Sequence, residues 1–240
     1  MSIWDRVRYV WMNGDFVDWR EATVHLSSPV VNMGLGVFEG IRAYWNPRIK
    51  QLNVFRLRDH LNRLFDSAKV HRMHVPFSKG DIEKAVVELL SSNNFREDIY
   101  IRPIIYRGNL WQEEESIDTG IYAGPRATRL KGVDKGVRCC VSGWRRMSDS
   151  ILPARVKACG NYLQYHYAMS EALASGFDNT ILLTVSGKVS ESPGANIFLI
   201  RDGVLITPSI TSDILEGVTR NTLIRTIREK LDLEVVEREV

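Results

Sequence analysis

The segment 191–220 contains the three stretches on which the interpretation of the chain depends: ESPGANIF at 191–198, LIT at 205–207 and LEGVTR at 215–220. Glu191 sits among apolar stretches, and a carboxylate in such surroundings needs a cation or a protonated nitrogen as its partner. Gly217, Val218 and Thr219 stand at the start of the last expected helix. The start of a helix can bind a phosphate through its free N–H groups and the positive end of the helix dipole. The segment therefore predicts an acid and an anion site close together in sequence.

A lysine upstream adds a third chemical group. Lys157 lies among small residues in PARVKACGNYLQ, just ahead of an expected helix. Taken singly, the three features have plainer interpretations: a surface cation, an exposed hairpin carboxylate and an N-cap threonine. Together they match the needs of pyridoxal phosphate, which takes an amine for covalent attachment, an acid that keeps the ring nitrogen protonated, and an anion site.

The segment 191–220 resembles the signature of the fold-type IV, or class IV, pyridoxal-phosphate aminotransferases in both residue type and spacing. In the first half of the chain, VFEGIRAY, DHLNRLFDSAK and YIRP resemble the branched-chain amino acid aminotransferase subgroup in the same order. The likeness spans essentially the whole chain. It implies an α+β fold in two lobes, similar to D-amino acid aminotransferase. Because the family continues past the point that matches LEVVEREV, we expect the second lobe to lack its C-terminal part.

The resemblance also implies roles for single residues. Lys157 would be the catalytic lysine, which carries the internal aldimine and moves the proton. Glu191 would pair with the pyridine nitrogen, and Tyr162 would hydrogen-bond the phenolic oxygen of the cofactor. The other implied positions form a phosphate group and a substrate group: Arg63, Gly217, Val218 and Thr219 for the phosphate, and Phe38, Gly40, Tyr100 and Arg102 for the substrate.

Several of these roles rest on the resemblance alone. By helical spacing, Arg63 lies away from the apolar face of its helix, where a solvated arginine would also lie. Tyr100 and Arg102 fit a strand face with a surface ion pair as well as a carboxylate site, although the planar fork of arginine suits a carboxylate.

The implied activity is transamination. An amino acid, of which branched-chain L-amino acids fit the subgroup, passes its amino group through the Lys157 aldimine and a pyridoxamine intermediate to a 2-oxo acid such as 2-oxoglutarate. The expected setting is amino-acid biosynthesis by a cytoplasmic homodimer. Two alternatives share the fold, a D-amino acid aminotransferase and an aminodeoxychorismate lyase. A third is a catalytically inactive, truncated homologue that acts as a binding protein.

Four positions depart from the family pattern. Met33 stands where the branched-chain subgroup commonly has an aromatic pocket residue, and Arg126 falls near a frequent tryptophan. Pro193 replaces a small residue and Ser192 a common glycine beside Glu191. A cation at the pocket mouth favours an additional carboxylate or another polar substrate group, so these departures bear on specificity more than on transamination.

Composition narrows the remaining functions. The 240 residues include 32 Lys and Arg against 29 Asp and Glu, a net charge of +3, and 44% are hydrophobic, which is typical of a folded globular protein. No dominant basic field favours nucleic acid, and no apolar run approaches the ~18 residues of a membrane helix. Three cysteines without a CxxC pair fit a reducing compartment. His71 and His74 have no companion ligands, so no metal site is expected.

The pattern of elements predicts two domains. Residues 1–122 form a small α+β domain, 123–135 a linker rich in Gly and basic residues, and 136–240 a large cofactor-binding domain. The first domain is expected to contain a hairpin turning at Asn13-Gly14, a helix from Asp59, a helix capped by Ser78 and a buried strand from Ile99. The second is expected to contain helices at 161–175 and 219–231, and a meander of the strands TILLTV, KVSES, ANIFLI and VLITP.

Overall fold

The computed structural model describes residues 3–109, 116–125, 133–231 and 233–240. The chain divides into two compact units: unit 1 is Met1–Ala127 with Lys157–Gly160, and unit 2 is Thr128–Val156 with Asn161–Val240. Of the predicted linker, residues 123–125 belong to a strand and 126–132 lie outside the described residues. The domain boundaries at 122 and 136 stay a prediction. Among the described residues, no helix has the length and apolar character that a membrane crossing requires.

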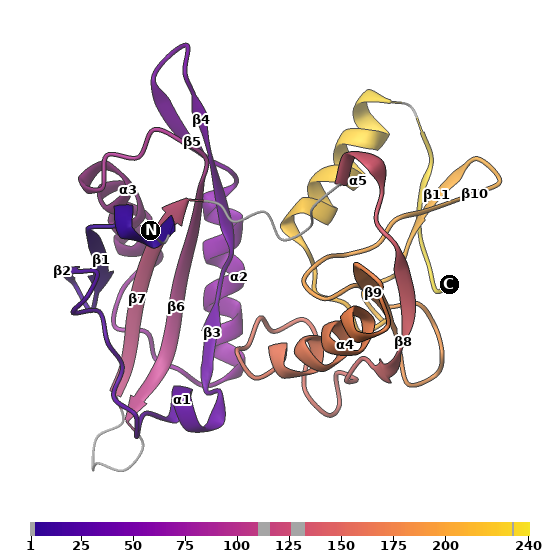
Figure 1. The fold of residues 1–240 in the computed structure, drawn as a ribbon, viewed down its shortest axis with the longest axis horizontal. Helices are drawn as coiled ribbons and strands as arrows, with labels where there is room; N and C mark the ends of the chain where they lie inside the picture. The colour runs from indigo at the N-terminus through magenta and orange to yellow at the C-terminus, as the bar shows by residue number, and fades with distance from the viewer. Residues whose placement is uncertain (1–2, 110–115, 126–132, 232) are drawn as a thin grey trace. The chain divides into compact units, whose positions relative to one another are not determined.

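Unit 1 is built on an antiparallel sheet, which within the described residues has seven strands in the order β2-β1-β7-β6-β4-β5, with β3 paired to β6 (Figure 1). The long central strand β6 starts at Ile99, as predicted, and its first half alternates buried and half-buried residues. The strands are β1 Tyr9–Met12, β2 Asp15–Asp18, β3 Gly36–Phe38, β4 Ile41–Asn46, β5 Gln51–Val54, β6 Ile99–Asn109 and β7 Ser116–Pro125.

The predicted hairpin at the start of unit 1 is confirmed. Met12 pairs with Asp15, so the loop has two residues. Asn13 and Gly14 have φ values of 49° and 108°, and a turn of this kind needs positive φ at both positions.

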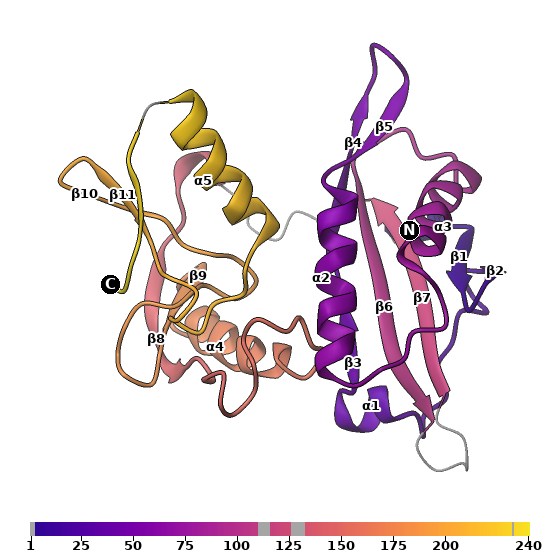
Figure 2. The ribbon, with the colours of Figure 1, turned by 180° about the vertical axis from the view of Figure 1, so that it is seen from behind.

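The helices of unit 1 are α1 Pro29–Met33, α2 Leu57–Val70 and α3 Lys79–Ser92, after a short 3₁₀ helix, η1, at Ile3–Arg6. Figure 2 shows α2 and α3 in front of the sheet. Leu61 and Leu64 of α2 are buried, which confirms the predicted apolar face. A capping box starts α3, because the Ser78 side chain accepts from the Asp81 backbone and the Asp81 side chain accepts from the Ser78 backbone.

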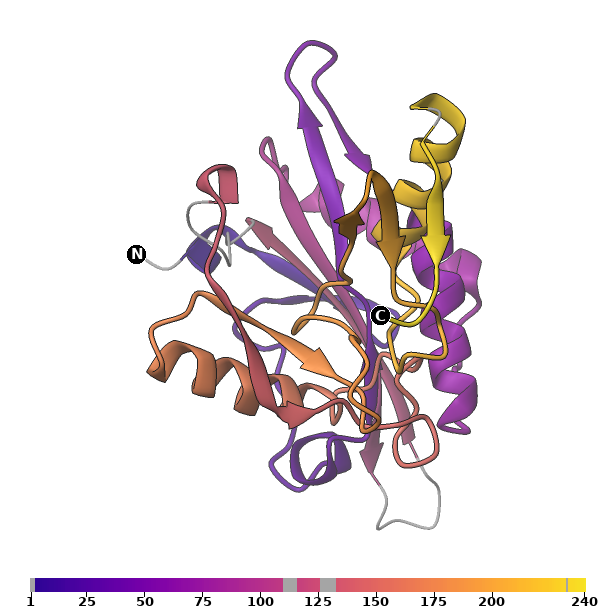
Figure 3. The same cartoon turned by 90° about the vertical axis from the view of Figure 1, so that its right-hand side faces the viewer.

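In its described part, unit 2 contains two small sheets and two long helices (Figure 3). After the 3₁₀ helix η2 (Val133–Lys135), the parallel pair β8 (Cys139–Arg145) and β9 (Asn179–Leu183) is connected through α4 (Tyr162–Ala174), which packs on both strands. The second sheet has the order β10-β11-β12, and α5 contacts β12. Its elements are β10 Leu199–Arg201, β11 Val204–Thr207, α5 Val218–Lys230 and β12 Val235–Glu237.

The predicted meander in unit 2 forms only in part, because its strands belong to two separate sheets. TILLTV forms β9 and runs parallel to β8, because a helix connects the two strands and returns the chain in the same direction. KVSES forms no strand of its own, but it lies antiparallel to β9 through the Leu183–Val189 bridge and through backbone bonds from the Ser190 N–H to the Leu182 carbonyl (3.0 Å) and from the Leu182 N–H to the Glu191 carbonyl (2.9 Å). The hairpin β10–β11, which turns at Asp202-Gly203, also has the expected antiparallel pairing. The two helices predicted for this half of the chain are confirmed within one or two residues.

Candidate active site

The segment that carries Lys157 pairs with β3 of unit 1. The Phe38 N–H donates to the Lys157 carbonyl at 3.0 Å, and the Cys159 N–H donates to the Gly36 carbonyl at 2.8 Å. Val37 and Ala158 form an antiparallel bridge between these two bonds. This pairing explains why Lys157–Gly160 belongs to unit 1, although the chain on both sides belongs to unit 2.

The Lys157 backbone is also held from α2. Its N–H donates to Ser67 Oγ at 3.2 Å, and Ser67 is buried on that helix. The side chain is half-buried, with Nζ at 5.2 Å from the centroid of the Phe38 ring. Two bonds to the backbone from two different elements therefore fix the point from which the amine extends.

Beside this lysine, unit 1 contains a fully buried carboxylate, that of Glu39. Arg63 donates two hydrogen bonds to this carboxylate, from Nε to Oε1 at 2.6 Å and from Nη2 to Oε2 at 2.9 Å. His60 Nδ1 lies 2.8 Å from Oε2, and the Gly40 N–H donates to the same oxygen at 3.1 Å. Two-point binding of this kind is the strong geometry for an arginine and a carboxylate.

The surroundings of Glu39 decide its ionisation. Burial by itself raises the pKa of this carboxyl group, but the hydrogen bonds from His60 and Arg63 and the charges of Arg63 and Lys157 outweigh it and lower the pKa to about 2. Glu39 is therefore an anion at every pH at which the protein is expected to work, and Lys157 is among the cations that stabilise it.

The residues predicted to contact the substrate come together in unit 1. Arg102 donates to the Tyr100 hydroxyl through Nη2 at 2.5 Å, and its guanidinium lies 4.3 Å from the centroid of the Phe38 ring. A Cβ on Gly40 would lie 2.6 Å from the Tyr100 hydroxyl, so only glycine permits this approach. Phe38 thus has the cations of both Arg102 and Lys157 near its ring.

Unit 2 contains the second buried carboxylate, that of Glu191. Its Oε1 accepts from the Tyr165 hydroxyl at 2.5 Å and lies 3.3 Å from Arg146 Nε. Its Oε2 accepts from Asn196 Nδ2 at 3.0 Å and from the Leu215 N–H at 3.1 Å. Glu191 is only 2% exposed, so its charge is stabilised by donors of the protein rather than by water.

Tyr165 and Arg146 are both buried beside this acid. Burial, followed by the charge of Glu191, raises the pKa of Tyr165 well above its usual value. The phenol therefore stays protonated and donates a hydrogen bond to Glu191. The Arg146 guanidinium lies 4.8 Å from the centroid of the Tyr165 ring. Its Nε also donates to the Asp213 carbonyl at 3.1 Å, and its Nη1 to Gln164 Oε1 at 3.2 Å.

The predicted phosphate residues of unit 2 stand at the start of α5. Gly217 is the N-cap, Val218 is the first helical residue, and no side chain caps this end. The N-cap is thus Gly217 rather than Thr219, which is exposed. Tyr162, the residue predicted to reach the cofactor's phenolic oxygen, is the first residue of α4, and its ring meets that of Tyr165 edge-on at 5.1 Å.

Three of the positions that depart from the family pattern fall within the described residues. Met33 is 51% exposed at the end of α1. Ser192 and Pro193 stand in a tight turn, closed by two backbone bonds between Ser192 and Ala195, in which Gly194 has a φ of 76°. Proline followed by a residue with positive φ is typical of a type II turn, so Pro193 suits the backbone next to Glu191. Arg126 lies outside the described residues.

The sequence singles out Lys157, Glu191 and the expected substrate residues, but not the side chains that contact them in the structure. Glu39 and Asn196 lie inside the quoted stretches VFEGIRAY and ESPGANIF without an assigned role, so their positions were visible in the sequence. No local pattern distinguishes the other supporting residues: His60, Ser67, Arg146 and Tyr165. Arg63 was expected to be either solvated or on a phosphate, and the structure pairs it with Glu39.

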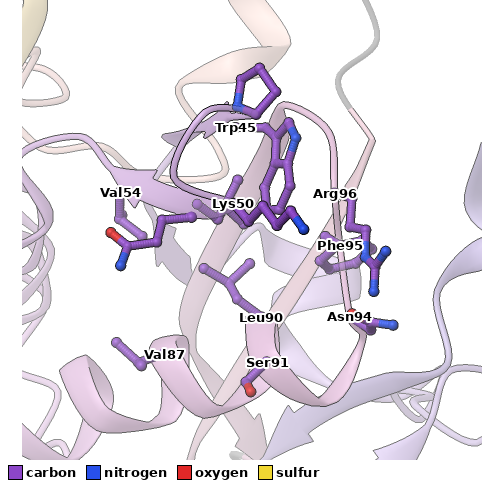
Figure 4. A pocket seen from close by; sticks show the side chains of 12 residues that line it. Trp45, Lys50, Val54, Val87, Leu90, Ser91, Asn94, Phe95 and Arg96 are labelled. Atoms are coloured by element: carbon purple, nitrogen blue, oxygen red, sulfur yellow. The ribbon is translucent and has the colours of Figure 1, made fainter.

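A cavity of about 680 Å³ lies elsewhere in unit 1, between the β4–β5 hairpin and the end of α3 (Figure 4). Its lining includes Trp45, Leu90 and Phe95, together with the exposed cations Lys50 and Arg96. It contains none of the residues discussed above.

Comparison with known proteins agrees with this chemistry. The family model for amino-transferase class IV matches residues 36–240. A probable branched-chain-amino-acid aminotransferase of Aquifex aeolicus is 38% identical over 236 residues, which cover 97% of this chain and 76% of that protein.

Two solved structures are also similar. The branched-chain aminotransferase of Thermoproteus uzoniensis with norvaline is 44% identical, with a TM-score of 0.91 over 97% of this chain and 78% of that one. The PLP form of the Thermobaculum terrenum branched-chain aminotransferase is 39% identical, with a TM-score of 0.89 over 97% and 77%. Both structures have the fold-type IV architecture expected from the resemblance. The chain therefore belongs to the class IV aminotransferase family.

Proposed function

We propose that this protein is a pyridoxal-phosphate-dependent transaminase that moves the amino group between branched-chain L-amino acids and a 2-oxo acid such as 2-oxoglutarate. Relatives at 38–44% identity that are named as branched-chain aminotransferases support the reaction, and one of them is solved with norvaline. The observation within this chain that carries the proposal is the buried, ionic environment of Glu191. An acid so far from water requires cationic or donor partners, and a protonated ring nitrogen is such a partner.

The residues present fit this cofactor. Lys157 supplies the amine for covalent attachment, and Glu191 supplies the acid for the ring nitrogen. The start of α5 at Gly217, Val218 and Thr219, which no side chain caps, would hold the phosphate at the positive end of the helix dipole. Arg63 adds a cation whose position is fixed by Glu39, and Tyr162 offers a hydroxyl for the phenolic oxygen.

When bound, pyridoxal phosphate supplies the electron sink for negative charge at the substrate's α-carbon. The protein binds, orients and moves protons. The Lys157 Nζ takes the proton from the α-carbon and returns it to the neighbouring atom, for which its fixed backbone is suited. Phe38 and Gly40 line the side-chain pocket, and Arg102, oriented by Tyr100, binds a substrate carboxylate.

Two wider properties belong to the same proposal. We infer a homodimer from the fold-type IV resemblance, because enzymes of this type place residues of a first-lobe loop in the partner's site. We also infer a cytoplasmic location, since the three cysteines are free and free thiols suit a reducing compartment.

Borohydride trapping tests the site. The protein is incubated with pyridoxal phosphate, reduced and digested, and the modified peptide is identified by mass spectrometry. We expect the cofactor on Lys157 and none on that peptide in Lys157→Ala, which should fold normally and lose transamination. A fully active Lys157→Ala variant, or attachment only at other lysines, would contradict the assignment.

Side-by-side assays test the substrate. The release of 2-oxo acid is measured from L-leucine, L-isoleucine, L-valine and D-alanine, with 2-oxoglutarate as acceptor, and pyruvate release is measured from aminodeoxychorismate. We expect turnover of the three branched-chain amino acids. Faster turnover of D-alanine or of aminodeoxychorismate would replace the substrate class while leaving the cofactor assignment intact.

A further inference from the structure

Arg146 is the most deeply buried arginine among the described residues, at 2% exposure. It follows β8, where its backbone N–H donates to the Leu183 carbonyl at the end of β9 at 2.8 Å. Its Nε lies between two acceptors, the Asp213 carbonyl at 3.1 Å and Glu191 Oε1 at 3.3 Å. A buried guanidinium needs acceptors on its donors, and one of those that Arg146 uses is the acid assigned to the cofactor.

Tyr165 adds a second contact to the same oxygen. Its hydroxyl donates to Glu191 Oε1 at 2.5 Å, and its ring lies against the Arg146 guanidinium. Arg146 and Tyr165 therefore meet both at Oε1 and with each other, so the position of each side chain restricts the other. Oε1 thus has a donor in Tyr165 and a cation in Arg146, while Asn196 and the Leu215 N–H donate to Oε2.

We propose that Arg146 and Tyr165 are positioning residues that keep Glu191 ionised and oriented, so that the proton shared between Glu191 and the cofactor's ring nitrogen stays on the nitrogen. This inference rests on the proposed function, because it requires pyridoxal phosphate as the partner of Glu191. Hydrogen bonds and a positive charge directed at a carboxylate favour its charged form. A carboxylate stabilised in this way holds a shared proton less strongly than the nitrogen does.

Arg146 has two opposite effects on that proton. Its charge repels a protonated ring nitrogen, while its contact with Glu191 stabilises the anion that attracts one. Coulomb energy falls with distance, and Arg146 is in direct contact with Oε1. The contact with Glu191 therefore outweighs the repulsion, and loss of Arg146 should move the proton toward the acid.

NMR can measure directly whether the ring nitrogen of the cofactor carries the proton. Pyridoxal phosphate labelled with ¹⁵N in the ring is bound to the protein, and its ¹⁵N resonance is recorded, because protonated and unprotonated pyridine nitrogens resonate at well-separated positions. We expect a protonated nitrogen in the wild type. Arg146→Gln should shift the resonance at least halfway to the unprotonated position, Tyr165→Phe should shift it less in the same direction, and Arg146→Lys should restore part of the wild-type value.

Arg220 is a matched control. It is another buried arginine of unit 2, at 6% exposure, and it pairs with Glu237 at 2.9 Å. Arg220→Gln should lower stability without moving the resonance. A wild-type resonance in cofactor-bound Arg146→Gln, or a shift in the opposite direction, would overturn the inference.

If Arg146→Gln does not fold, Arg146→Lys and Tyr165→Phe decide, and two unchanged resonances overturn the inference. A failed borohydride trap on wild-type Lys157 would instead refute the proposed function itself, so the two failures are distinguishable.

Discussion

Among the described residues, each unit contains one fully buried glutamate beside an arginine, and the two pairs differ in construction. In unit 1, Arg63 binds Glu39 through two nitrogens, and His60 adds a third side chain. In unit 2, Arg146 Nε lies 3.3 Å from Glu191 Oε1, and the Tyr165 hydroxyl, the Asn196 amide and the Leu215 N–H donate to the same carboxylate. Arg63 therefore donates two hydrogen bonds to its acid, whereas Arg146 meets its acid in an ion pair.

The difference indicates that a buried acid can either hold neighbouring residues in place or attract a bound cation. A charge-assisted, two-point pair restricts both partners, so Glu39 is suited to holding Arg63 and the Lys157 region in place. Neutral donors orient a carboxylate without cancelling its charge, so Glu191 keeps attraction for a cationic partner. Arg146 also has acceptors other than Glu191, at Asp213 and Gln164.

Replacing each of the two glutamates by glutamine should have the largest effects on stability and activity. The two results test whether the acids differ in role. Glu39→Gln leaves Arg63 without its counter-charge, and we expect the free energy of unfolding to fall by about 3–5 kcal/mol. Glu191→Gln should cost about 1–3 kcal/mol, because Arg146 keeps its other acceptors, but should lower kcat on the order of 100-fold. Urea unfolding and initial rates measure the two quantities.

The matched pair contains its own control, since both substitutions remove one charge and keep the shape of the side chain. Equal losses of stability in the two variants, with transamination intact in Glu191→Gln, would show that both acids are structural.

Acid sensitivity is the next largest effect and should arise from unit 1. The pKa of Glu39 falls from 4.5 to about 2 in the folded protein. A lowered pKa stabilises the fold at pH values above 4.5, and this contribution is lost as the pH falls from 4.5 toward 2. The shift corresponds to about 3 kcal/mol.

Unfolding free energies measured by urea denaturation between pH 6 and pH 3 check this expectation. Glu39→Gln should flatten the fall in stability below pH 4.5. An equally steep profile in that variant would assign the acid sensitivity to other carboxylates.

A smaller effect in unit 2 tests how firmly Glu191 is oriented. A Cβ on Gly217 would lie 2.1 Å from Asn196 Oδ1, and Asn196 cannot retreat without losing its bonds to Glu191 and to the Leu215 carbonyl. Gly217→Ala should therefore lower the unfolding free energy by about 1–3 kcal/mol and weaken cofactor binding, measured by fluorescence titration.

Gly80→Ala is the matched control for that substitution. Its Cβ would meet only Ser78 Oγ, at an ordinary 3.6 Å, and alanine in a helix is favoured over glycine by about 0.5–1 kcal/mol. A Gly217→Ala protein as stable as Gly80→Ala would mean that Asn196 moves freely.

Local signals account for what the sequence predicts well. Asn13-Gly14, the apolar face of α2 and the Ser78 cap each depend on neighbours within a few residues, and all three are confirmed. The meander was correct only for neighbouring segments. The parallel pairing of β9 with β8 depends on the path of the chain through α4, which apolar strand patterns do not encode. The same limit applies to Arg146, which is distant in sequence from Glu191 and meets it only in the folded unit.

The smallest expected effect compares two helix starts. The Ser78 side chain and Asp81 cap α3 reciprocally in unit 1, whereas no side chain caps α5 at Gly217 in unit 2. Ser78→Ala should lower the unfolding free energy by about 1 kcal/mol, independently of added pyridoxal phosphate. Ligands stabilise the state that they bind, so the cofactor should instead raise the melting temperature of wild type and Ser78→Ala equally. A smaller cofactor-induced rise in Ser78→Ala would mean that the start of α3, and not only that of α5, contributes to cofactor binding.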